Sequence, residues 1–340
     1  MKDGQAHAFA DAATDRVGCP AAGKIDRRAL PPGALESLWI APDGHAIRRL
    51  DLTISGDRPL RGALLFLSGR GDCYEKYIES LTQWQARGWQ VTALDWRGQA
   101  GSGRAGRDDR TGHIDDFATW VGDLAAFWAV WQAETAPPHV LVAHSMGGHL
   151  ALRAVAERTF LPAALVLSVP MLGLPALGLP QAALYEVARL MARMGDRRRP
   201  AWPDNEKPGY QDDRMLLLTH DADRFADEAW WREQRPELAM GSPSWGWVER
   251  GLASIRLLEQ PGQLEAVTVP VLLIGARADE LVSYRAIERA ADRLPFGELL
   301  SFGSEAAHEV LREVDAVRDV AMAAIDEFLD RVVPQSSPAR

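Results

Sequence analysis

Residues 140–148 read Val140-Leu141-Val142-Ala143-His144-Ser145-Met146-Gly147-Gly148. The run Val140–Ala143 is apolar throughout, which is typical of a strand buried on both faces of a parallel sheet. A helical pattern begins at once at Ser145. A strand-to-helix turn this sharp strains the backbone and admits only small side chains two positions before and after the serine, here Ala143 and Gly147. The stretch therefore predicts a serine raised above a sheet edge, rather than an ordinary serine that caps a helix.

A serine hydroxyl is hardly ionised near neutral pH, so Ser145 requires a base to act as a nucleophile. Among eight histidines, His308 has the expected position. It follows an apolar strand predicted over Glu298–Phe302 and precedes a helix predicted over Glu309–Val332. His144 adjoins the serine, but neighbouring side chains at such a turn point apart. We therefore predict that His308 is the base.

An acid is needed to orient the imidazole of the base. Asp279 stands just beyond the apolar strand predicted over Val269–Ile274. The carboxyl ends of parallel strands are where open α/β sheets bind their ligands. The order Ser145, Asp279, His308 is the one expected for a nucleophile on a strand-to-helix turn. Glu280 is the neighbouring competitor, which we expect to be a solvated loop carboxylate.

Two backbone amides are candidates for an oxyanion hole. Met146 follows the serine at the helix N-terminus, where amides point toward developing negative charge. The second candidate is Arg70, in Ser68-Gly69-Arg70-Gly71 after the apolar run Ala63–Leu67. Glycines on both sides of Arg70 allow the backbone to approach a substrate closely. The alternative is a plain glycine-rich turn.

Working outward, apolar strands alternate with helical patterns, which predicts an α/β protein with a mostly parallel, doubly wound sheet. An antiparallel hairpin is expected at its edge, around the turn Asp43-Gly44. The alternation is interrupted by a stretch rich in tryptophan, which we interpret as a helical insertion. We predict an N-terminal arm at residues 1–34 and a core at residues 35–169 and 268–333. A helical cap is predicted at residues 170–267 and a tail at residues 334–340.

Composition excludes several classes of protein. The chain has 38 basic and 47 acidic residues, a net charge of -9, so nucleic acid is not an expected partner. Two cysteines, Cys19 and Cys73, make neither a disulfide framework nor a zinc site. We expect no metal and no cofactor. The residues 159–185 carry no charge, but their four prolines favour a buried strand and an apolar loop over a membrane span. Met1–Ala10 has no apolar signal region, so we expect a cytoplasmic location.

Several further blocks complete a pattern that resembles a known family. They are Ser68-Gly69-Arg70-Gly71-Asp72 with Glu75-Lys76-Tyr77, Asp95-Trp96-Arg97-Gly98-Gln99-Ala100-Gly101-Ser102, His113-Ile114-Asp115-Asp116-Phe117, His144–Gly148, Asp279–Val282 and His308-Glu309. Over roughly residues 35–333 the chain resembles α/β-hydrolases of the lysophospholipase L2 and monoacylglycerol lipase group, also described as serine aminopeptidase S33-like. It departs from that pattern in having Ser68 for histidine, Ala143 for the first glycine, and Ala100 inserted.

The resemblance implies a serine esterase that hydrolyses lipid-like carboxylic esters, lysophospholipids or monoacylglycerols, through an acyl-enzyme. It also implies that residues 170–267 cap the site. Trp245 and Trp247 would then line an acyl-chain tunnel or form the core of the cap itself. Arg197–Arg199 would meet a lipid phosphate or an anionic membrane surface, the inner membrane surface for a cytoplasmic protein, or would remain solvated. An aminopeptidase of the proline-iminopeptidase kind and a non-catalytic binding protein stay open as alternatives.

Overall fold

One eight-stranded sheet organises the molecule. The computed structural model describes residues 25–54, 59–175, 180–203 and 210–333. The strands are β1 (Ala34–Ile40), β2 (Ala46–Leu52), β3 (Gly62–Leu67), β4 (Trp89–Leu94), β5 (His139–His144), β6 (Ala164–Ser168), β7 (Val271–Ala276) and β8 (Gly297–Phe302). Their order across the sheet is β1-β2-β4-β3-β5-β6-β7-β8. β1 and β2 form the expected antiparallel hairpin around Asp43-Gly44, and β2 also pairs antiparallel with β4.

The other strands form a parallel sheet with a buried centre. β3 pairs in parallel with both β4 and β5, and the parallel pairing continues through β6 and β7 to β8. Every residue of β3, β5, β6 and β7 is buried. Because these strands are covered on both faces, their sequences are continuous apolar runs instead of alternating ones. The predicted α/β sheet is confirmed.

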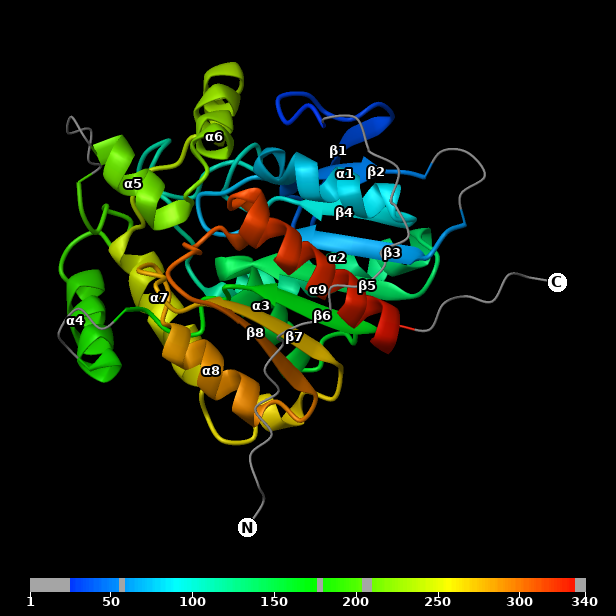
Figure 1. The fold of residues 1–340 in the computed structure, drawn as a ribbon. Coiled ribbons are helices and arrows are strands. Elements are labelled where there is room, and N and C mark those ends of the chain that lie inside the picture. The colour runs from blue at the N-terminus through cyan, green and yellow to red at the C-terminus, as the bar shows by residue number, and fades with distance from the viewer. Residues whose placement is uncertain (1–24, 55–58, 176–179, 204–209, 334–340) are drawn as a thin grey trace, which may run out of the picture.

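Helices cover both faces of this sheet. In the described residues the α-helices are α1 (Ile78–Ala86), α2 (Phe117–Glu134), α3 (Ser145–Ala156), α4 (Gln181–Arg193), α5 (Tyr210–Leu218), α6 (Ala222–Gln234), α7 (Trp245–Leu258), α8 (Tyr284–Arg293) and α9 (Asp315–Val332). Figure 1 shows α1 and α9 on the near face of the sheet and α2 and α3 behind it. The arrangement places the ends of several strands, and the loops that follow them, within reach of one another.

Helices α4 to α7 occupy the chain between β6 and β7, where the sequence predicts an insertion. They gather at one end of the sheet, on the left of Figure 1. The end of the expected N-terminal arm is tied to them, because the guanidinium groups of Arg27 and Arg28 pair with Asp227 on α6. Residues 1–24 of that arm and the expected tail, 334–340, lie outside the described residues.

Two other predictions meet different outcomes. The prolines in residues 159–185 act as expected, since β6 ends at Ser168, and within the described part of the chain no helix has the length and apolar character needed to cross a membrane. The helix predicted over Glu309–Val332 is wrong at its start. A 3₁₀ turn covers Val310–Arg312, and α9 begins only at Asp315. The amide of Glu309 bonds outside the segment, to Leu218 O on α5 at 2.7 Å, which holds the chain away from the helical path.

Candidate active site

Ser145 lies at the junction of β5 and α3 in a strained conformation. Its φ is +52°, in the left-handed region that non-glycine residues rarely adopt. A side chain at Gly147 would place its Cβ 2.3 Å from the carbonyl oxygen of Ser68, so only glycine fits there. Ala143 is fully buried. The serine carbonyl accepts a hydrogen bond from the amide of Met171 at 3.0 Å, beyond the end of β6. The backbone around Ser145 is therefore fixed from both sides.

The structure brings Ser145, His308 and Asp279 into one hydrogen-bonded chain. Ser145 Oγ lies 2.9 Å from His308 Nε2, and His308 Nδ1 lies 2.7 Å from Asp279 Oδ2. Ser145 and His308 are buried, at 8% and 5% exposure. This arrangement allows the imidazole to accept the serine proton at Nε2 while its Nδ1–H donates to the carboxylate.

The carboxylate of Asp279 is oriented by its own loop. Its Oδ1 accepts hydrogen bonds from the amides of Leu281 at 2.7 Å and Val282 at 3.0 Å, which leaves Oδ2 for His308. Burial raises the pKa of Asp279, but the charge of His308 and these hydrogen bonds outweigh burial and hold the pKa below its usual value. Glu280, the competing acid, is exposed. The geometry thus favours Asp279 as the group that orients the base.

The loop after β3 lies against the serine. The amide of Gly69 donates to Asp72 Oδ2 at 3.1 Å, and the amide of Gly71 donates to Gln99 Oε1 at 2.6 Å. A Cβ at Gly69 would lie 3.1 Å from the Cβ of Ser145. Arg70 stands between these two glycines, so its backbone passes close to the nucleophile. Met146 is fully buried in the first turn of α3, directly after the serine.

His144 is the other histidine near the serine. Its ring packs between those of Tyr77 and His308, with centroids 5.7 and 4.9 Å away. Burial, and then the charge of nearby His308, lower the pKa of His144 to about 4. The ring therefore stays neutral at physiological pH and packs beside the base without competing for the serine proton.

The two tryptophans expected near substrate lie at the start of α7. Trp247 is 6% exposed, belongs to the main hydrophobic core and packs on Phe117 at 5.5 Å between centroids. The guanidinium of Arg70 lies over its indole ring at 5.3 Å. Trp245 is half-buried. Trp247 therefore packs into the main hydrophobic core and not into a separate core of the cap, and contact of either tryptophan with substrate stays a prediction.

Sequence reasoning missed the residues that hold the loops of the site. Asp72 accepts the Gly69 amide, the Tyr77 hydroxyl at 2.8 Å and the Lys76 ammonium at 3.1 Å. Gln99 fixes the Gly71 amide, and the inserted Ala100 beside it takes a left-handed φ of +44°. The spacing of Asp72 and Lys76, i and i+4, was the available signal. Among the residues that the structure describes, no group of three or more His, Cys, Asp or Glu could hold a metal ion.

Comparison with known proteins decides the family. The model of the family described as serine aminopeptidase, S33, matches residues 58–315. The chain belongs to this family. Curated relatives in sequence include lysophospholipase L2 of Escherichia coli (strain K12), 30% identical over 282 residues that make up 77% of this chain and 78% of that protein. The probable lysophospholipase L2 of Haemophilus influenzae is 26% identical over 82% of this chain and 86% of its own length.

Solved structures confirm the α/β-hydrolase fold of this family member. A soluble variant of monoglyceride lipase from Saccharomyces cerevisiae superposes with a TM-score of 0.72 at 17% identity, covering 93% of this chain and 99% of that one. The monoacylglycerol lipase of Paleococcus ferrophilus gives a TM-score of 0.64 at 19% identity, over 84% of this chain and 99% of its own. The predicted fold class and family resemblance are therefore confirmed.

Proposed function

We propose that this protein is a serine hydrolase of lipid-like carboxylic esters, with Ser145 as nucleophile, His308 as base and Asp279 as orienting acid. The observation that carries the proposal is the continuous contact from Ser145 Oγ through His308 to Asp279, at 2.9 and 2.7 Å, on a strand-to-helix turn. The expected class, a serine ester hydrolase, is borne out by relatives named lysophospholipase and monoglyceride lipase. A lysophospholipid or a monoacylglycerol is the proposed substrate.

The first half of the reaction acylates the serine. His308 Nε2 takes the proton from Ser145 as Oγ attacks the ester carbonyl, and the carboxylate of Asp279 stabilises the imidazolium that forms. The tetrahedral intermediate carries its negative charge on the former carbonyl oxygen. We assign the amides of Met146 and Arg70 to that oxygen, because the two flank Ser145 from α3 and from the loop after β3.

Collapse of this intermediate completes the acylation, and a second half-reaction then releases the acid. The imidazolium of His308 gives its proton to the departing alcohol, which leaves an acyl group on Ser145. Water, deprotonated by the same imidazole, then attacks the acyl carbonyl. The bond between the acyl carbon and Ser145 Oγ breaks, the imidazolium of His308 returns its proton to Oγ, and the carboxylic acid departs. Each step uses only groups of this chain, the substrate and water, so we expect the reaction to need neither metal nor cofactor.

The test is hydrolysis by the wild type and by Ser145→Ala. Removing a triad residue costs about 10⁴-fold or more in turnover. We expect the variant to fold normally by circular dichroism, to lose ester hydrolysis to that extent and to resist labelling by a fluorophosphonate. Retention of a tenth of the wild-type activity would remove Ser145 from the role of nucleophile.

A substrate panel separates the enzyme classes. We expect turnover of lysophospholipids, monoacylglycerols and p-nitrophenyl esters, and little turnover of a prolyl-naphthylamide. The reverse preference would instead support the aminopeptidase alternative. A wild type that neither hydrolyses an ester nor reacts with a fluorophosphonate would support a non-catalytic binding protein.

The cap offers a surface for lipid. Two exposed apolar side chains lie three residues apart on α4, which puts them on one face. They are Val187 and Leu190, at 47 and 58% exposure, and Met194, 57% exposed, directly follows the helix. Arg193 and Arg198, both exposed, lie beside them in sequence. An apolar helix face with adjoining cations is typical of helices that lie in the interface of an anionic membrane. This supports contact of the cap with an anionic membrane surface, which for a protein in the cytoplasm, the expected location, is the inner membrane surface.

Vesicle binding tests this contact. Leu190→Glu places a charge on the exposed face of α4, whereas Val320→Glu makes the same change at an exposed valine of α9, and Val320 is 50% exposed. We expect wild type and Val320→Glu to co-sediment with vesicles that contain phosphatidylglycerol, and Leu190→Glu to remain in the supernatant. Equal binding of both variants would place the membrane contact elsewhere.

A further inference from the structure

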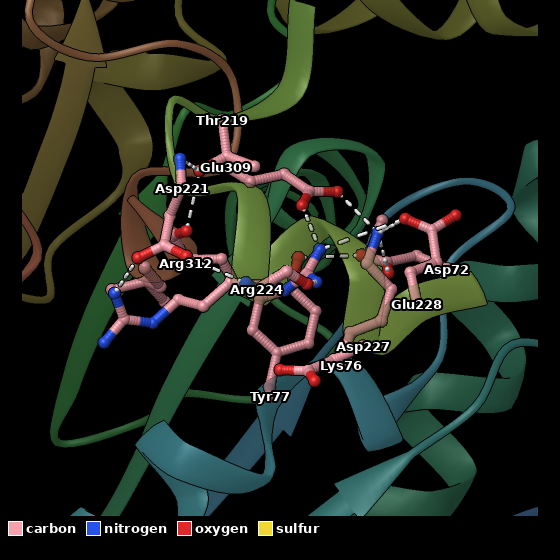
Figure 2. A network of polar contacts seen from close by, with 12 residues as sticks. Asp72, Lys76, Tyr77, Thr219, Asp221, Arg224, Asp227, Glu228, Glu309 and Arg312 are labelled. Atoms are coloured by element: carbon pink, nitrogen blue, oxygen red, sulfur yellow. Dashed lines mark hydrogen bonds and ion pairs between the residues drawn. The ribbon is translucent and has the colours of Figure 1, made fainter. Parts of the chain in front are cut away.

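A buried lysine lies at the junction of the cap and the two loops of the site. Lys76, in the 3₁₀ turn Tyr74–Tyr77, has a side chain only 4% exposed. Its Nζ contacts three carboxylates, Asp72 at 3.1 Å, Glu228 at 3.1 Å and Glu309 at 2.5 Å. Figure 2 shows the lysine with these partners. A buried ammonium needs such compensation, because an unpaired buried charge is strongly unfavourable.

The three carboxylates come from three different parts of the fold. Asp72 belongs to the loop after β3, and its other oxygen accepts the amide of Gly69. Glu228 belongs to α6 of the cap. Glu309 directly follows His308, the proposed base. One ammonium group therefore joins the loop that carries a proposed oxyanion donor, the cap, and the segment that carries the base.

Several cations share the carboxylates of this cluster. The guanidinium of Arg312 bonds to Glu309 and lies 3.9 Å from Glu228. Glu228 also receives Arg214 at 2.6 Å from α5. Burial raises the pKa of Glu228, but Lys76 and the nearby arginines outweigh burial and hold it well below its usual value. The group remains charged at neutral pH, so withdrawal of α6 would remove one of the three negative partners of the lysine.

A second ion pair shows that simple anchoring of α6 does not require this cluster. The guanidinium of Arg224, on α6, binds both carboxylate oxygens of Glu79 on α1, at 2.8 and 2.9 Å. Glu79 is not among the partners of Lys76. Ion pairs outside the cluster therefore also hold α6 to the core, and the Lys76 contact is the one that reaches the loop after β3 and the residue after His308.

We propose that Lys76 is a positioning residue for hydrolysis, which holds the oxyanion loop and the segment of His308 in register when α6 presents Glu228. The inference rests on the proposed function, since it concerns the same Ser145 site. It makes the placement of the cap a condition for full turnover. A closed cap thereby aligns the reacting groups in addition to covering them.

The test compares Glu228→Gln with Glu79→Gln. Each replaces a carboxylate that holds α6 by an amide of the same size, but only the first removes a partner of Lys76. Turnover of a short p-nitrophenyl ester gives kcat and KM, and thermal unfolding gives stability. Because a displacement of about 1 Å can cost ~10²-fold in rate, we expect Glu228→Gln to lower kcat about tenfold or more with little change in KM. Glu79→Gln should lower the thermal stability, because it removes an ion pair that holds α6. It should keep kcat within about twofold, because Glu79 does not contact Lys76.

Each outcome decides the question. Equal kcat values for the two variants, or a wild-type kcat for Glu228→Gln, would overturn the inference while the proposed function stands. Absence of ester hydrolysis by the wild type would remove both. If Glu228→Gln fails to fold, the shorter pair Glu228→Asp and Glu79→Asp applies the same criterion, with the loss of kcat again expected only at Glu228. A uniform loss of stability with unchanged kcat would then assign the cluster a structural role alone.

Discussion

The centre of the sheet and its junction with the cap are buried by different means. In β3, β5, β6 and β7 every residue is buried, and nearly all are aliphatic. At the junction the buried side chains include Lys76, Glu228, Glu309 and Arg312, none more than 9% exposed. Apolar burial is non-directional and supplies most of the stability of a fold. Buried ion pairs add little net stability, but they demand one geometry. The sheet thus supplies stability, whereas the junction specifies how the cap sits.

The largest expected effect concerns Asp279, which follows β7 at the end of the sheet. Asp279→Asn should reduce kcat/KM by about 10⁴-fold, because an amide neither stabilises the imidazolium nor enforces its tautomer. Glu280→Gln, one residue further on and exposed, should change it by less than about twofold, as surface substitutions usually do. Steady-state kinetics on one ester checks both. A larger loss at Glu280 would move the acid by one position.

The next largest effect is expected at the turn that carries the nucleophile. A Cβ at residue 147 would lie 2.3 Å from Ser68 O, so Gly147→Ala must separate α3 from the loop after β3. We expect a loss of about tenfold to 10²-fold in kcat, as for a small displacement of reacting groups. The control is Gly122→Ala in α2, where a Cβ meets nothing within 4 Å. That variant should gain up to about 1 kcal/mol in helix stability with unchanged kcat. A wild-type kcat for Gly147→Ala would show that the turn accommodates an alanine side chain without displacing Ser145.

A smaller effect distinguishes the roles of the cap tryptophans. Trp247→Ala should lower the free energy of unfolding by about 3–5 kcal/mol, because Trp247 is buried against Phe117. Trp245→Ala, at a half-buried site, should cost less than about 2 kcal/mol. Denaturant unfolding measures both, and rates on esters of increasing chain length report on substrate contact. A changed chain-length preference of Trp247→Ala, with wild-type stability, would support the alternative that Trp247 lines an acyl-chain tunnel.

The smallest expected effect is none at all. The serine mechanism needs no Lewis acid, because the imidazole of His308 activates the nucleophile. Dialysis against EDTA should therefore leave ester hydrolysis unchanged. A loss of activity that added metal ions restore would contradict this expectation.

The elements of the sheet could be predicted because their signals are local. An apolar run such as Val140–Ala143 predicts a strand buried on both faces, and the small residues near Ser145 predict a sharp turn. The pairing of His308 with Ser145 followed from the order of strands. At the junction the local signal was limited to the i, i+4 spacing of Asp72 and Lys76, since Lys76 and Glu309 are 233 positions apart in sequence and look like ordinary surface charges. The predicted start of the helix after His308 was wrong for the same reason, because the contact with α5 that changes the path of the chain comes from a distant part of the sequence.

The distance along the chain between Ser145 and His308 has a consequence for biosynthesis. The two residues are 163 positions apart, and contacts of such separation form late. During synthesis from the N-terminus, the strand and turn that carry the serine leave the ribosome well before the histidine. A nascent chain therefore exposes a hydroxyl without a base, which is inert toward esters. Ester hydrolysis therefore waits until His308 has been synthesised and has folded against the serine.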